Sequence, residues 1–135
     1  GDQQLVVQRA AYKLAQDLRR AQEMALSSQK VDGEVPAGYG VYLNKNQPER
    51  YILFADINGD QRYSGSSEKV EEIVLERTAI ISDLSPQLVS ALTIVFVPPN
   101  PSVFFYPDAV TASITVAIKE AKTIQVNKAG LIAVE

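Results

Sequence analysis

Apolar residues recur at helical spacing through the opening segment, from Gln3 to about Gln29. Steps of four and three residues place them on one stripe of a helix: Val7, Ala11, Leu14, Leu18, Ala21 and Ala25. Polar residues are expected on the opposite face: Gln8, Arg9, Lys13, Gln16, Asp17, Arg19, Arg20 and Glu23. The first glycine or proline after Gly1 is Gly33. The segment is therefore predicted to form one long amphipathic helix.

Beyond Val31 the pattern changes to short apolar runs separated by turn residues. These runs predict strands at 39–43, 51–55, 73–75, 79–82, 92–97, 103–106, 113–118, 123–126 and 131–134. Because the connections are short and show no helical pattern, the strands should be mostly antiparallel. The predicted fold is α+β: a long N-terminal helix packed on an antiparallel β-sheet or β-meander. We expect one domain over 1–135, with a helix stem at 3–29 and a β-rich head at 38–135.

Composition limits the chemistry more than the fold. The chain has no cysteine and no histidine, which excludes disulfides, thiolate metal sites and the commonest general base. The serines between Ser64 and Ser67 lack a nucleophile-elbow or Ser-x-x-Lys pattern, and no phosphate-binding glycine loop is present. A net charge of −3 argues against a general nucleic-acid binder. We therefore expect a non-enzymatic protein without a small-molecule substrate.

The run Asp56-Ile57-Asn58-Gly59-Asp60 places three oxygen-bearing side chains at alternate positions. This spacing starts an EF-hand-like calcium loop, which Glu68 or a backbone carbonyl could complete. Gln61 stands where such a loop needs glycine, and Ser67 rather than Glu68 occupies the twelfth position. The alternative is a β-turn at Asn-Gly with solvated acidic neighbours, and we favour it over a calcium site formed by Asp56, Asn58, Asp60 and Glu68.

Three lysines near the C-terminus, Lys119, Lys122 and Lys128, could lie together on the last strands. Phosphate binding usually requires more positive charge, and here the lysines alternate with Glu120 and Glu135. A solvated strand face is the favoured interpretation, and DNA binding is the alternative.

Three segments together resemble type IV pilin-like proteins, and most closely the minor pseudopilins and minor pilins of the GspH/FimT type. They are the helix from Ala10 to Ala25, the strand and loop from Ile52 to Asp60, and the strand–turn–strand from Ile124 to Val134. The sequence departs from the family at its start, because the hydrophobic first half of the pilin helix, with its cleavage site and the following Glu, does not appear. The resemblance implies that this half precedes Gly1 in the natural precursor.

The resemblance implies a structural subunit of a type II secretion or type IV pilus filament, cleaved and N-methylated by a prepilin peptidase. Its partners would be other pilins or pseudopilins, contacted through the helix stripe Val7, Ala11, Leu14, Leu18, Ala21 and Ala25. The precursor would be anchored in the cytoplasmic membrane with its head outside the cytoplasm. Some pseudopilins bind calcium, and FimT-like pilins bind DNA through basic C-terminal residues. The alternatives are a DNA-binding competence pilin and an unrelated α+β or secreted binding domain whose helix only covers its own sheet.

Overall fold

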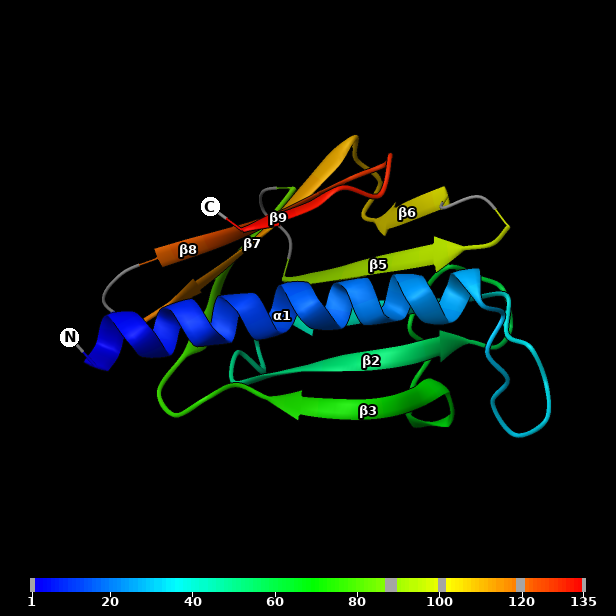
Figure 1. Cartoon of the computed structure of the whole chain (residues 1–135), viewed down its shortest axis with the longest axis horizontal. Helices are drawn as coiled ribbons and strands as arrows, with labels where there is room; N and C mark the ends of the chain where they lie inside the picture. Colours follow the sequence, from blue (N-terminus) through cyan, green and yellow to red (C-terminus); the bar gives the residue numbers. More distant parts are fainter. Residues whose placement is uncertain (1, 87–89, 100–101, 119–120, 135) are drawn as a thin grey trace.

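A computed structural model describes residues 2–86, 90–99, 102–118 and 121–134, with side chains in the last range from 123. Helix α1 (Asp2–Leu26) runs along the length of the molecule in front of the sheets (Figure 1). The strands are β1 (Gly38–Asn44), β2 (Arg50–Asp56), β3 (Lys69–Val74), β4 (Ile80–Ser85), β5 (Ala91–Val97), β6 (Ser102–Tyr106), β7 (Thr111–Ala117), β8 (Ala121–Asn127) and β9 (Ile132–Val134). A short 3-10 helix, η1 (Ser66–Glu68), precedes β3.

The strands form two antiparallel sheets. One has the order β3-β2-β1-β5-β6, and the other has the order β4-β7-β8-β9. Every strand pairing described within them is antiparallel. The α+β prediction is therefore confirmed, while the division into two sheets was not foreseen.

The hydrophobic core lies between α1 and the inner faces of both sheets, because the helix packs on β1 and β5 of one sheet and on β7, β8 and β9 of the other. All six residues of the predicted apolar stripe are buried, each 2% exposed or less, and all but Val7 belong to this core. Burying one leucine of this stripe contributes roughly 1.5–3 kcal/mol. The stripe is thus used by the chain's own sheets.

The outer face of the five-stranded sheet carries a second, smaller apolar cluster. Its buried members are Ile52, Phe54 and Val95. Gly40 of β1 makes room for it, since a Cβ there would lie 2.9 Å from the ring of Phe54 and 2.2 Å from the carbonyl oxygen of Ile94. The sheet therefore has apolar packing on both sides.

The helix differs from its prediction in two ways. It ends at Leu26 rather than near Gln29, because Ser28 adopts a left-handed conformation (φ 52°) and the N–H of Gln29 bonds back to the carbonyl of Met24. This is a Schellman ending, which serine rather than the usual glycine forms here. The expected polar position of Asp17 was wrong, because this residue is buried, with 1% of its surface exposed.

No helix in the described part of the chain is both long enough and apolar enough to cross a bilayer.

Candidate functional site

The predicted acidic loop connects β2 to β3, and a buried carboxylate closes it at each end. Asp56, the last residue of β2, is fully buried. One of its oxygens accepts a hydrogen bond from the N–H of Gly59 at 3.1 Å, and the other accepts one from the N–H of Gln61 at 2.9 Å. Hydrogen bonds to a charged acceptor are about twice as strong as neutral ones. Asp56 therefore holds the first half of the loop.

Glu68 closes the other end of the loop. It is 3% exposed, and its two oxygens accept hydrogen bonds from the N–H groups of Ile57 and Ser64, each at 2.8 Å. Ser67, at the twelfth position of the calcium pattern, is exposed instead. The carboxylate one place further on is thus the one that faces the loop.

The remaining polar residues of the loop bond to one another. The side-chain oxygen of Asn58 accepts from the N–H of Asp60 at 3.2 Å, and Asp60 accepts from the N–H of Arg62 at 2.9 Å and the hydroxyl of Ser64 at 3.1 Å. Gln61 adopts φ 63°, the left-handed conformation for which the calcium pattern uses glycine. The backbone therefore makes the sharp turn despite the side chain.

One oxygen from each of Asp56, Asp60 and Glu68 lies within 4.8 Å of the others. Burial raises the pKa of Asp56; the bond from Gln61 opposes this, and the charges of Glu68 and Asp60 add to it. At Asp60 burial acts in the same direction, but hydrogen bonds from Arg62, Ser64 and Asn58 outweigh it and lower the pKa.

This arrangement offers three carboxylate oxygens to a hard cation, which needs six to eight oxygen ligands. Asn58 and backbone carbonyls would have to supply the rest. Calcium binding therefore stays a prediction. The favoured alternative, a β-turn at Asn58-Gly59 with solvated acidic neighbours, needs correction at Asp56, which is fully buried, whereas Asp60 is exposed as expected. The connection is also longer than a hairpin turn, since residues 57–68 separate β2 from β3. The acids act instead as hydrogen-bond acceptors for a folded loop.

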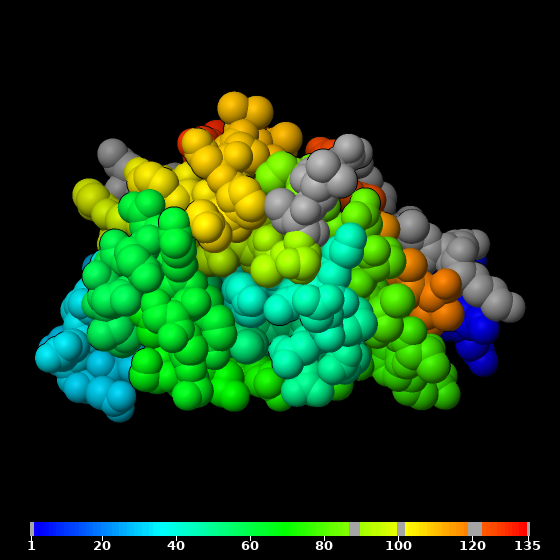
Figure 2. All heavy atoms as spheres, turned by 180° about the vertical axis from the view of Figure 1, so that it is seen from behind, coloured from blue at the N-terminus to red at the C-terminus, as the bar shows by residue number. Residues whose placement is uncertain are grey.

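The same loop reaches back over the outer face of the five-stranded sheet, and we call residues 57–65 the strap. The ring of Tyr63 lies 5.0 Å from that of Tyr42 on β1 and 5.4 Å from that of Phe54 on β2, measured between centroids. Next to it, the guanidinium of Arg62 lies 3.8 Å from the ring centroid of Tyr106 on β6. Viewed from the side opposite the helix, the green surface of the strap adjoins the yellow surface at the end of β6 (Figure 2).

A groove of about 410 Å³ lies between the strap and strands β1, β5 and β6. It is lined by Tyr42, Arg62, Tyr63, Ser90, Ala91, Thr93, Tyr106 and Pro107. Tyr106 is half exposed at the rim, and Thr93 is buried. Tyr42 and Tyr106 fall in two predicted strands, at 39–43 and 103–106, but the sequence pattern gives no sign that Tyr63 lies beside them. The backward course of the strap brings the three together.

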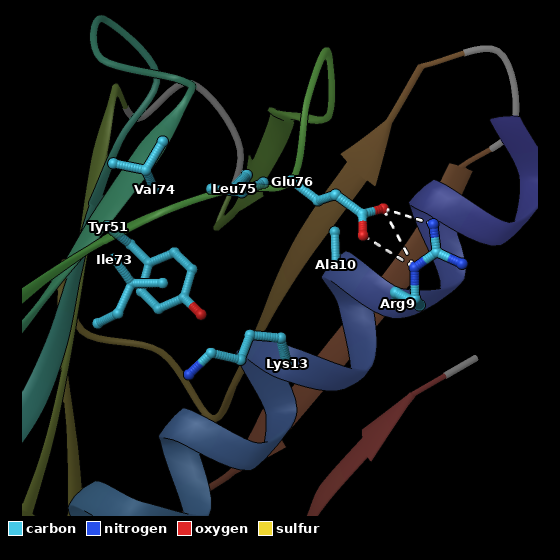
Figure 3. Close-up of a pocket in the computed structure, with 8 residues that line it drawn as sticks. All are labelled: Arg9, Ala10, Lys13, Tyr51, Ile73, Val74, Leu75 and Glu76. Carbon is cyan, nitrogen blue, oxygen red and sulfur yellow. Dashed lines mark hydrogen bonds and ion pairs between the residues drawn. The ribbon is translucent and has the colours of Figure 1, made fainter.

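A second pocket, of about 290 Å³, lies between α1 and the edge strand β3 (Figure 3). Arg9 spans it with a two-pronged ion pair to Glu76, its Nε lying 2.8 Å and its Nη2 2.9 Å from the two carboxylate oxygens. The hydroxyl of Tyr51 and the amine of Lys13 point toward the same space (Figure 3). This pocket is a gap between the helix and the sheet edge that long polar side chains bridge.

The polar centre beside this pocket is Asp17. Its carboxylate accepts a hydrogen bond from the hydroxyl of Tyr51 at 2.6 Å and from Lys13 at 2.9 Å, and Arg20 Nε lies 3.9 Å away. Burial raises the pKa of Tyr51, and its bond to Asp17 raises it further. Both partners of the phenol–carboxylate bond are buried, so it fixes the helix on β2. Sequence reasoning missed it, although Asp17 lies three residues from Leu14 and four from Ala21, at the margin of the stripe.

The predicted basic patch is only partly described. Lys119 lies outside the described residues, and so does the side chain of Lys122. Lys128 Nζ lies 3.3 Å from a carboxylate oxygen of Asp108. The described part of the patch therefore carries a local ion pair, and DNA binding stays an untested prediction.

A scan against protein-family models found no matching family, and searches among curated proteins and solved structures found no match. The resemblance to the GspH/FimT-type proteins therefore stays a prediction, based on the residue patterns of the helix, of 52–60 and of 124–134.

Proposed function

We propose that this chain is a non-enzymatic structural subunit of a pilin-like filament, of the minor pseudopilin or minor pilin kind. The observation that supports it most is α1: 25 residues that lie along two antiparallel sheets, one face buried and the other open. A helix built this way can carry a folded head and still present a continuous surface to neighbouring subunits. The partners would be other subunits of the same filament.

In this proposal a neighbouring subunit binds the open face of α1. Leu5, Tyr12 and Leu26 are its exposed large apolar residues, with 50%, 54% and 44% of their surfaces accessible. They are spaced by seven and fourteen residues, so they share one side of the helix. The expected contact thus moves from the inner stripe, which is occupied within the domain, to this outer row.

The polar groups at the two buried centres support a structural role. The carboxylates of Asp56 and Glu68 accept hydrogen bonds from loop N–H groups, and that of Asp17 accepts from Tyr51 and Lys13. Each group thus stabilises the fold. In this proposal the head lies outside the cytoplasm, and a preceding apolar segment anchors the precursor in the cytoplasmic membrane.

Crosslinking from a single introduced cysteine tests the filament contact directly, since residues 1–135 contain no cysteine. The full-length gene, carrying Tyr12→Cys or Leu5→Cys, would be expressed in its native cell and labelled with a maleimide–diazirine photocrosslinker, which needs only one thiol and inserts into a neighbouring chain on illumination. Val110→Cys is the matched control, because Val110 is 81% exposed and lies between β6 and β7, away from the helix.

We expect both helix variants to give crosslinked species that contain this chain and another filament subunit or a second copy. The control should give few or none. Equal crosslinking by all three variants, or none by the helix variants when labelling is complete, would overturn the proposal.

A further inference from the structure

The groove beside the strap has the chemistry of a recognition surface rather than of a packed core. Tyr42, Tyr63 and Tyr106 supply aromatic surface with polar ends, and Thr93 lies at its buried side. Tyrosine provides a large contact area at low cost in conformational entropy, which is why it is common in binding surfaces.

Arg62 gives the groove a charge preference. Its guanidinium is stacked on Tyr106, and the residue is exposed. Arg62 makes no ion pair with any residue that the structure describes. Stacking leaves the edges of a guanidinium free to donate to a carboxylate. A ligand with a carboxylate at this point would therefore be favoured over one with an amine.

The strand next to Arg62 is an open sheet edge. Among the described residues β6 pairs with β5 alone, so its other side presents backbone donors and acceptors. The exposure of β6 alternates, with Val103 and Phe105 buried and Ser102 and Tyr106 exposed. A strand added at this edge would place every second side chain on the face that carries Tyr106 and Arg62, at cross-strand distances of about 5 Å.

We propose that this chain binds an extended, acidic peptide segment of another protein by adding it as a strand to β6. A carboxylate of the peptide pairs with Arg62, and an apolar side chain on the same strand face packs against the exposed ring of Tyr106, on the side away from β5. Main-chain hydrogen bonds provide affinity and the alternate side chains provide selectivity, as in other strand-addition complexes. The proposal does not depend on the filament function.

Two synthetic peptides test this assignment. One is an acetylated and amidated octapeptide that alternates valine with glutamate, and the other replaces each glutamate with lysine. Each would be titrated to millimolar concentration into the isotope-labelled full chain, followed by amide shifts and hydrogen exchange. We expect the glutamate peptide to shift the amide signals of β6 and of Arg62, and to slow the exchange of β6 amides that face away from β5.

Arg62→Gln should weaken binding of the glutamate peptide at least fivefold, a change of about 1 kcal/mol. Arg77→Gln, which alters another exposed arginine next to β4, is the matched control and should bind normally. Tyr106→Ala provides a second variant, since it removes the surface on which Arg62 stacks and should weaken binding as well. The thermal midpoint of each variant shows whether it is folded.

Equal binding of both peptides, unchanged affinity in Arg62→Gln, or no binding at millimolar concentration would overturn the proposal. Shifts at the tyrosines without protection of β6 amides would contradict strand addition, since the peptide would then only occupy the groove.

Discussion

The two faces of the five-stranded sheet are covered in different ways. On the inner face α1 seals the core, and its stripe is at most 2% exposed. On the outer face the strap contributes two side chains, Arg62 and Tyr63, and leaves a groove of about 410 Å³ beside them. The inner cover thus provides stability, while the outer cover shapes a surface.

One buried carboxylate holds α1 on the inner face and another holds the strap on the outer face, but their hydrogen-bond donors differ. The carboxylate of Asp17 accepts hydrogen bonds from the phenol of Tyr51 on β2 and from Lys13 on α1, so it joins these two elements. Asp56 is bound by the backbone N–H groups of Gly59 and Gln61, close to it in the chain, so it shapes one loop. Loss of the hydrogen bonds to Asp17 should therefore destabilise the whole fold. Loss of those to Asp56 should open the strap and leave the sheet intact.

The largest effect is expected from shortening a residue of the inner stripe. Leu18→Ala leaves a cavity under α1 and should lower the free energy of unfolding by about 2–5 kcal/mol. Urea denaturation followed by circular dichroism measures this. Leu26→Ala is the control because Leu26 is 44% exposed, and it should cost less than about 0.5 kcal/mol. Similar losses in the two variants would mean that α1 does not seal the core.

Removing the phenol from the Asp17 centre tests how the helix is fixed. Tyr51→Phe keeps the ring but leaves the buried carboxylate without its hydroxyl donor, so we expect a loss of about 1.5–3 kcal/mol. Tyr42→Phe on the outer face should cost much less, because the hydroxyl of Tyr42 is partly exposed and accepts only a 3.2 Å bond from Asn44. A smaller loss for Tyr51→Phe than for Tyr42→Phe would reverse the proposed order of the two faces.

Asp56→Asn tests the loop and has a pH dependence of known sign. An amide offers one oxygen in place of two, so one loop N–H loses its acceptor at a cost of about 1–3 kcal/mol. Burial raises the pKa of Asp56 above its ordinary 3.8, so the folded state binds the proton more tightly than the unfolded state. Stability from this group is complete below about pH 3.8 and falls as the pH rises through the folded-state pKa.

The deficit of Asp56→Asn relative to the natural chain should therefore be larger at pH 4 than at pH 7, as measured by urea denaturation at both values. Hydrogen exchange should show faster exchange of Gly59 and Gln61 while β1 and β5 stay protected. Faster exchange throughout the sheet would show that the loop contributes to global stability, as the Asp17 centre does.

Addition of calcium should have a small effect, since the loop carboxylates already accept hydrogen bonds from the backbone. We expect the thermal midpoint of chelator-treated protein to be the same in calcium as in magnesium at equal ionic strength. A saturable, calcium-specific increase that Glu68→Gln removes would contradict this and establish the cation site.

The smallest effect is expected at the ion pair of Arg9 with Glu76. Both side chains are exposed, and hydration and salt weaken such a pair. Glu76→Gln should leave the thermal midpoint within experimental error at roughly physiological salt. A clear loss of stability would show that this pair contributes to holding α1 on the connection between β3 and β4.

The regular elements were predictable because their signals are local. The helical spacing from Val7 to Ala25 and the alternating strands require only near neighbours in sequence, and each strand that the structure describes overlaps a predicted one. The start of β3 was placed too late, at 73 rather than Lys69, because Lys69, Glu71 and Glu72 face solvent on an edge strand and give no apolar pattern.

The site was less predictable because it depends on contacts that sequence spacing does not show. Glu68 was named as a candidate, but nothing in the pattern placed Tyr63 on Phe54 or Arg62 on Tyr106. Asp17 was assigned to the wrong face, since a carboxylate is buried only when partners such as Tyr51, 34 residues away, can bind it. Helix periodicity alone does not report those partners.

The packing of α1 against strands of both sheets has a consequence for the order of folding. The strap joins adjacent strands, and its closing acids, Asp56 and Glu68, are near neighbours in sequence, so it can form early and locally. The helix instead needs β8 and β9, and Arg19 donates to the carbonyl of Ile132, 113 residues away. Contacts this distant slow folding. During synthesis the apolar stripe of α1 stays without its full cover until β9 has been made, so a chaperone is most useful to this protein before that point.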